Sequence, residues 1–176
     1  LAAAARLTLY RGASLGHHPR ATMSAETLPV TLTAVDLGDD ADVAAFVAFI
    51  NANYKSPFPV DAATVRDPQR RYFWAHDPAG ARVGTAAYVR KTAFLAETVK
   101  TVVDPAHRKR GLGAAISRAI EDELRRAGFK KAMSTIYIDN IPMIVIKLRQ
   151  GYIVEGLHRD HEKPGLHEYS LGKRLI

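Results

Sequence analysis

A chain of 176 residues with 47% hydrophobic and 24% charged residues has the size and composition of one soluble globular domain. It contains no cysteine, which excludes disulfides, thiolate metal ligands and a cysteine nucleophile. No apolar run approaches the roughly 20 residues that cross a bilayer, and the net charge of +7 suits an anionic ligand without requiring nucleic acid. We expect a cytoplasmic protein with neither a membrane nor a nucleic-acid partner.

The first residues differ in composition from the rest of the chain. Residues 1–22 hold Arg6, Arg11 and Arg20 and no acidic residue. Such a segment is compatible with an amphipathic presequence, but an upstream extension before a start at Met23 is the simpler interpretation. We expect residues 1–28 to lie outside the fold and residues 29–176 to form a single domain.

In chain order, the remaining sequence alternates between strand and helix patterns. Asp39 or Asp40 can cap a first helix, and three prolines mark residues 54–68 as a loop around one short helix. The aromatic triplet at 72–74 is expected in the core rather than against a ligand. We predict strands over residues 30–35, 71–76, 82–90, 94–103, 130–138, 151–157 and 166–171, and longer helices over residues 40–53, 111–127 and 140–150.

The helix over 111–127 carries an apolar stripe. The stripe recurs every fourth residue, and Gly128 ends the helix as a left-handed cap would. In the helix over 140–150 the apolar positions are Ile141, Ile144, Val145 and Leu148. The element order predicts one α/β domain with a mixed central sheet of about six to seven strands and about four helices.

A short cationic loop, HRKRGLGA at residues 107–114, leads into the second long helix. The strand before it stops at Asp104-Pro105, because proline lacks the amide hydrogen that a sheet needs. The free amides of a helix N-terminus attract phosphate, and Gly111 and Gly113 remove side chains that would block the approach. The loop lacks the Lys-Ser or Lys-Thr of a P-loop and the third glycine of the dinucleotide fingerprint. The pattern favours a pyrophosphate over a nucleoside triphosphate or NAD.

Two motifs resemble a known family. Arg108-x-x-Gly111-x-Gly113-Ala114 is similar to the acetyl-CoA signature R/Q-x-x-G-x-G/A of the GNAT superfamily of N-acetyltransferases. The stretch from Asn140 to Tyr152 is similar to that family's second pattern, N-x-x-A-x-x-L-Y-x-x-x-G-F. The resemblance implies the GNAT fold and transfer of an acetyl group from acetyl-CoA to a primary amine in a ternary complex.

The resemblance also implies how acetyl-CoA is held, without a metal ion. Main-chain amides of the glycine loop are expected on the pyrophosphate, and the preceding strand is expected to splay from its neighbour and pair with pantetheine. Asn140 corresponds to an asparagine that contacts the pantetheine arm, and it also suits a helix N-cap. The expected cofactor-binding residues are Val102, Val103, Arg108, Lys109, Arg110, Gly111, Leu112, Gly113, Ala114 and Asn140.

Catalysis in this family needs a base for the amine and an acid for the departing thiolate. Glu97 occupies the place of the general base of the histone-acetylating branch, and its largely apolar strand would strengthen it as a base; a solvent-facing carboxylate at a strand edge is the alternative. Lys147 stands where the family has its acidic tyrosine. Candidate acids are Tyr137, Tyr152 and Lys147, although Lys147 is also expected as an ordinary surface lysine.

The acceptor site is expected between the last hairpin and the loop after the first helix, with Tyr54, Phe58, His158 and His161 as contacts. The acceptor itself is a small-molecule or peptide amine. A zinc site at the histidines is not expected, because direct transfer needs none. Family members are often dimers, which makes a homodimer an expectation here. The alternative function is a non-catalytic CoA-binding sensor or partner-binding module, which the missing tyrosine favours.

Overall fold

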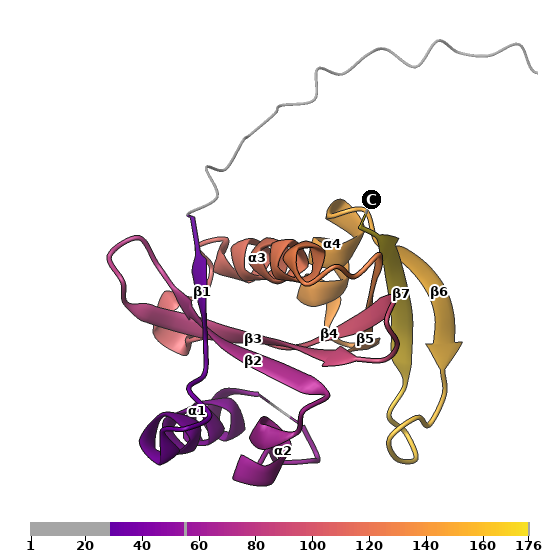
Figure 1. Ribbon diagram of the computed structural model, residues 1–176. Helices are drawn as coiled ribbons and strands as arrows, with labels where there is room; N and C mark the ends of the chain where they lie inside the picture. Colours follow the sequence, from indigo (N-terminus) through magenta and orange to yellow (C-terminus); the bar gives the residue numbers. More distant parts are fainter. Residues whose placement is uncertain (1–28, 55, 176) are drawn as a thin grey trace, which may run out of the picture.

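The structure is a computed structural model that describes residues 29–54 and 56–175. The expected extension at residues 1–28 lies outside the described residues. Figure 1 shows a central sheet with α3 (Leu112–Arg126) and α4 (Ile141–Arg149) on one face and α1 (Asp40–Asn53) and α2 (Ala62–Arg66) on the other. No described helix is both long and apolar enough to cross a membrane.

The sheet has seven strands in the order β1-β2-β3-β4-β5-β7-β6, and every neighbouring pair is antiparallel except β4 and β5. This confirms the predicted α/β fold with a mixed sheet. The single parallel pair is joined by a crossover through α3, as parallel strands require. The strands are β1 Thr31–Ala34, β2 Arg70–His76, β3 Arg82–Arg90, β4 Leu95–Val103, β5 Lys131–Tyr137, β6 Ile153–His158 and β7 Glu168–Arg174.

The helix boundaries follow from local capping. Asp39 accepts a hydrogen bond from the Ala41 amide and so caps α1, as predicted. Gly128 has a φ of 86° and ends α3 in the left-handed conformation that glycine adopts without cost. Pro105 opens a short 3₁₀ turn, η1 (Pro105–His107), which terminates β4 and leads into the basic loop.

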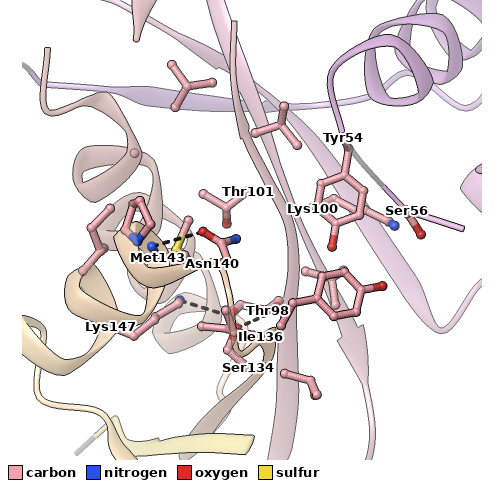
Figure 2. A pocket seen from close by; sticks show the side chains of 18 of the residues that line it. Tyr54, Ser56, Thr98, Lys100, Thr101, Ser134, Ile136, Asn140, Met143 and Lys147 are labelled. Carbon is pink, nitrogen blue, oxygen red and sulfur yellow. Dashed lines mark hydrogen bonds between the residues drawn. The ribbon is translucent and has the colours of Figure 1, made fainter. Parts of the chain in front are cut away.

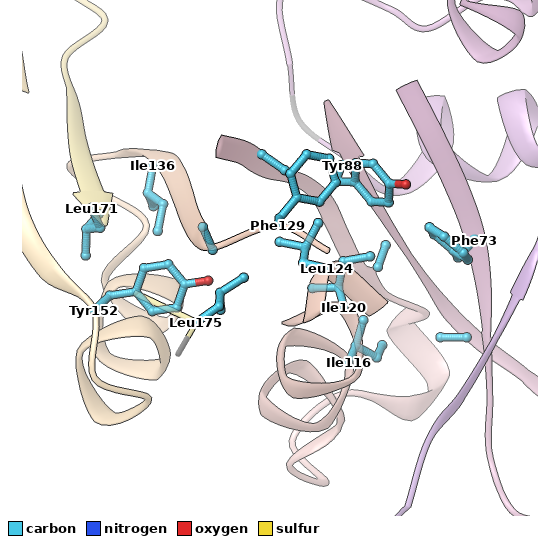
Figure 3. Close-up of a cluster of buried hydrophobic side chains, with 14 of the residues drawn as sticks. Phe73, Tyr88, Ile116, Ile120, Leu124, Phe129, Ile136, Tyr152, Leu171 and Leu175 are labelled. Carbon is cyan, nitrogen blue, oxygen red and sulfur yellow. The ribbon is translucent and has the colours of Figure 1, made fainter. Parts of the chain in front are cut away.

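The sheet separates two hydrophobic cores. On the α3 face, Ile116, Ile120 and Leu124 pack with strand residues and Phe129, as Figure 3 shows. On the α1 face, Phe46 makes edge-on contacts with Tyr72 and Trp74 at centroid distances of 5.2 and 5.0 Å. The expectation that the aromatic triplet is core is therefore confirmed, with its members divided between the two faces.

The sheet is incomplete in its middle. Strands β4 and β5 pair over only three residues, ending at Glu97 opposite Met133. Both strands continue beyond this point, β4 to Val103 and β5 to Tyr137, without pairing to each other. The expected splaying of β4 is confirmed, and it leaves one edge of β4 without a strand partner in the middle of the molecule.

The apolar residues of α4 are only partly buried. Ile144 is buried, but Ile141, Val145 and Leu148 are 58%, 37% and 45% exposed. The fully buried side chain on the same helix is instead that of Lys147, at 1% exposure. Positions 144 and 147 are three apart and therefore lie on one helix face, which the sheet covers.

Candidate active site

A cleft of about 1130 Å³ opens where β4 and β5 separate. Its walls come from β4, β5, the start of α3, α4, the loop after α1 and the loop between β6 and β7. Figure 2 shows Lys147 on one side of the separated strands and Tyr54 with Lys100 on the other. The cleft thus passes through the sheet from one face to the other.

One end of the cleft is formed by the basic loop. Lys109 and Gly111 have φ angles of 62° and 78°, and α3 begins at Gly111 without a side-chain cap. Alternation of left- and right-handed residues turns successive amides toward a common point, which makes an anion-binding nest. The positive end of the α3 dipole adds to this potential. The end of the cleft therefore suits a multiply charged anion.

The two loop glycines have different roles. Gly111 needs its freedom because of its positive φ, and a Cβ there would meet nothing within 4 Å. A Cβ at Gly113 would lie 3.4 Å from Ile146 and 3.8 Å from Val103, which is ordinary contact. Gly111 therefore sets the backbone conformation rather than clearing the approach, whereas an alanine at position 113 would fit.

Most of the expected cofactor-binding residues line this cleft. Asn140 does so while its side chain accepts a weak hydrogen bond of 3.4 Å from the Met143 amide, so it is also the N-cap of α4. Arg110 is the exception and lies outside the lining. The lining residues from the expected set are Val102, Val103, Arg108, Lys109, Gly111, Leu112, Gly113, Ala114 and Asn140.

The shape of the cleft fits a ligand with a diphosphate at one end and an extended amide chain beyond it. The nest faces the anion, and the open edge of β4 offers main-chain groups to the chain. These are the chemical parts of coenzyme A. The residues present therefore fit acetyl-CoA.

Lys147 is a correction to the expected surface lysine. It is 1% exposed and lines the cleft, and its Nζ donates a hydrogen bond of 3.1 Å to Thr98 Oγ1. Burial lowers the pKa of Lys147 from 10.5 to about 8, because the charged form loses its hydration. The ammonium also lies 4.6 Å from the centre of the Tyr152 ring. An amine with this pKa exchanges protons readily near neutral pH.

Glu97 lies on the opposite face of the sheet in a more polar setting than expected. Its side chain is 12% exposed, with one oxygen 2.9 Å from Lys91 Nζ. The other oxygen accepts a hydrogen bond of 2.6 Å from Thr135 Oγ1. Glu97 does not line the cleft itself, but Thr135 does. The apolar surroundings predicted for Glu97 are therefore wrong, and its contact with the cleft runs through the Thr135 hydroxyl.

The two candidate tyrosine acids differ in position. Tyr152 is buried behind Lys147, outside the cleft lining, and its hydroxyl has no hydrogen-bond partner in the described residues. Tyr137 lines the cleft and donates a hydrogen bond to Glu162, and burial followed by this bond raises its pKa. Burial likewise raises the pKa of Tyr152. Both phenols are therefore held in the neutral form.

Of the expected acceptor contacts, Tyr54 lines the cleft and the other three do not. Phe58 is 52% exposed. His158 and His161 stack on each other with centroids 4.7 Å apart, and His161 contacts Glu168 at 2.6 Å. Within the described residues no three His, Asp or Glu side chains form a metal-binding group.

Sequence reasoning missed Thr98, Thr135 and Lys100, which all line the cleft. The first two are ordinary strand residues and carry no signal of their own. Lys100 interrupts a run of β-branched residues in β4, a pattern that could have marked it. Its φ of 51° is unusual for a residue other than glycine, and the pairing of β4 with β3 is irregular at this point.

The sequence model of the acetyltransferase (GNAT) family matches residues 39–151. That span covers the helix α1, the glycine loop and α4, and so contains most of the cleft wall. No match to this chain is found among the curated proteins.

Solved structures with the same fold include the following three. A mutant form of the spermidine/spermine N-acetyltransferase from Vibrio cholerae matches with a TM-score of 0.68 and 15% identity, covering 83% of this chain and 94% of that one. The ribosomal-protein-S18-alanine N-acetyltransferase from Escherichia coli matches with 0.67 and 16%, over the same shares. The yncA protein from Salmonella typhimurium, solved with its cofactor acetyl-CoA, matches with 0.65 and 21%, covering 84% and 94%.

Proposed function

Since the chain belongs to the GNAT acetyltransferase family, we propose that it transfers the acetyl group of acetyl-CoA directly to a primary amine within a ternary complex. The observation that carries this proposal is the gap between β4 and β5, which opens beside the anion-binding nest at Gly111. Residues of the nest would hold the diphosphate, and the open edge of β4 together with Asn140 would hold the pantetheine arm. Acetyl-CoA supplies the thioester that is consumed.

The placement of titratable side chains on both faces of the sheet supports a base on one face and an acid on the other. Glu97 and Thr135 lie on the α1 face, where Tyr54 also lines the cleft and where we place the acceptor. Lys147 lies on the α3 face against Thr98. We assign the base to the first face and the acid to the second, so that the thiol and the amine approach the gap from opposite sides.

In this scheme the neutral amine of the acceptor attacks the thioester carbonyl, and the bond between carbonyl carbon and sulfur breaks. The proton lost by the amine passes to Glu97, through water or the Thr135 hydroxyl. The Lys147 ammonium stabilises the departing thiolate and gives it a proton. The lowered pKa of Lys147, about 8, makes that donation easier than from an ordinary lysine.

Lys147 also bears on the alternative, a CoA-binding module without activity. The loss of the family's tyrosine favours that alternative, but the buried, cleft-lining ammonium supplies an acid of suitable strength in its place. Calorimetry with acetyl-CoA, followed by detection of free CoA thiol with a panel of primary amines, separates the two functions. Binding with thiol release supports the transferase; binding without release from any amine supports the module; no binding overturns both.

A further inference from the structure

Lys100 lies in the cleft without an anionic partner. Four described lysines are at least partly buried: Lys100, Lys131, Lys147 and Lys173. Lys131 and Lys173 form ion pairs with glutamates, and Lys147 donates to Thr98. The Lys100 ammonium has no hydrogen bond and no ion pair within residues 29–54 and 56–175. It rests on the ring of Tyr54, 4.1 Å from the centroid.

This arrangement costs stability in two ways. Partial burial of an ammonium without a counter-ion loses hydration that a cation–π contact only partly replaces. The left-handed backbone of Lys100, at a φ of 51°, adds strain. The first cost would disappear with an uncharged residue, and the second would disappear only with glycine. A ligand that binds the ammonium is the simplest reason for the charge to be here.

The position of Lys100 identifies which ligand group it meets. Its side chain lies with Tyr54 on the side of the strands away from Lys147, as Figure 2 shows. That side is the acceptor side in the proposed function. Lys100 is two residues along β4 from Thr98, or roughly 7 Å at the usual rise of a strand. An anionic group at Lys100 would therefore lie within a few bonds of an amine at the point where the strands part.

The charges around Lys100 are of both signs. Arg70 and Lys100 are close enough to repel each other, and Lys163 lines the same part of the cleft. Glu162 is the carboxylate that acts most on Lys100, and Glu97 and Glu168 also lie near Tyr54, but none of the three forms an ion pair with Lys100. The Lys100 ammonium, which forms no ion pair within the described residues, would attract a carboxylate of the acceptor.

We propose that Lys100 binds the carboxylate of the acceptor, and that the acceptor is an amino acid whose amine lies close to that carboxylate. This inference rests on the proposed acetyl transfer and specifies its substrate class. The Tyr54 ring supports the apolar part of the lysine stem and positions the ammonium. The acceptor carboxylate then orients its own amine toward the gap between β4 and β5.

The test compares amines that differ only by a carboxylate: phenylalanine with phenethylamine, and lysine with cadaverine, with spermidine as a polycationic probe. We expect at least one amino acid of such pairs to show a kcat/KM at least tenfold above its decarboxylated partner. In Lys100→Met that advantage falls about 10- to 100-fold, the loss typical of a hydrogen bond to a charged group. The charge-retaining Lys100→Arg keeps most of it, and Lys130→Met, an exposed lysine away from the cleft, keeps all of it.

Two further measurements separate this proposal from the proposed function. The dissociation constant of acetyl-CoA is expected to be the same in wild type and Lys100→Met, which shows that the variant is folded. Calorimetry of each amino acid with the protein reports carboxylate binding without turnover. One outcome is that acetyl-CoA fails to bind while an amino acid binds to the wild type and not to Lys100→Met. That result would overturn the transferase function and support the Lys100 site. Preference for the decarboxylated amines or spermidine, or equal losses for both members of a pair, overturns the Lys100 site.

Discussion

Replacing Lys147 with methionine is expected to make the protein more stable and the enzyme slower. The folded protein lowers the pKa of Lys147 from 10.5 to about 8. At about 1.4 kcal/mol for each tenfold change in the protonation equilibrium, keeping the ammonium buried below pH 8 costs about 3 kcal/mol. Methionine has a similar length and no charge, and it leaves only a threonine hydroxyl without its donor. We expect a gain of about 2 kcal/mol at pH 7, or a rise in Tm of about 4–8 °C.

The stability difference between Lys147→Met and the wild type is expected to depend on pH. Between the folded pKa near 8 and the unfolded value of 10.5, the unfolded chain binds the proton and the folded chain does not. Wild-type stability therefore gains from this group as pH rises through that window. The burial cost of the ammonium is about 3 kcal/mol below pH 8 and about 1 kcal/mol at pH 10, so the advantage of Lys147→Met shrinks from about 2 kcal/mol at pH 7 to near zero at pH 10.

Urea unfolding at pH 7 and pH 10, monitored by the fluorescence of the single tryptophan, measures this difference directly. Lys130→Met is the control, because Lys130 is exposed and its removal should change stability by less than about 0.5 kcal/mol at both pH values. In parallel, kcat of Lys147→Met is expected to fall about 100-fold. A less stable variant, or a difference that does not change with pH, would refute the burial of a strained ammonium.

Three other substitutions test separate parts of the site and fold. Glu97→Gln is expected to lower kcat about 100-fold with little change in acetyl-CoA affinity, since Glu97 lies away from the nest; unchanged turnover would remove it from the mechanism. Gly111→Ala is expected to weaken acetyl-CoA binding about tenfold in calorimetry, because a left-handed backbone costs other residues about 1–2 kcal/mol. Gly113→Ala is expected to bind acetyl-CoA normally. Equal effects of the two substitutions would contradict the distinct roles of the glycines. Asp39→Ala is expected to cost about 1 kcal/mol in urea unfolding by removing the α1 cap, at unchanged kcat; a shift in kcat would mean that α1 helps to shape the cleft.

Patterns local to the chain predicted most of the architecture. The stop at Asp104-Pro105, the cap at Gly128 and the stripe of α3 depend on neighbouring residues only, and the structure has all three. The splayed edge of β4 came from family resemblance rather than from any local pattern. The final strand runs to Arg174, beyond the expected end at 171, because pairing with β5 continues to Lys131.

What the sequence did not predict depends on contacts between distant segments. In the sequence, Lys147 is a single charged residue within an apolar helix. Its burial depends on its contact with Thr98, which is distant in the sequence. The ion pair of Glu97 with Lys91 arises because the hairpin folds one residue back onto the other. Ile141 and Leu148 are apolar like Ile144, but they are largely exposed, which composition alone does not distinguish.

The three residue pairs that join β4 to β5 act as a short seam between two leaves of one sheet. A pantetheine arm lying along β4 would lengthen that seam and tie the leaves together, so that the ligand becomes part of the scaffold. Substitutions that extend the pairing of β4 with β5 in the absence of ligand would stabilise the protein and close the cleft. Greater stability from longer pairing of β4 with β5 is therefore incompatible with an open cleft.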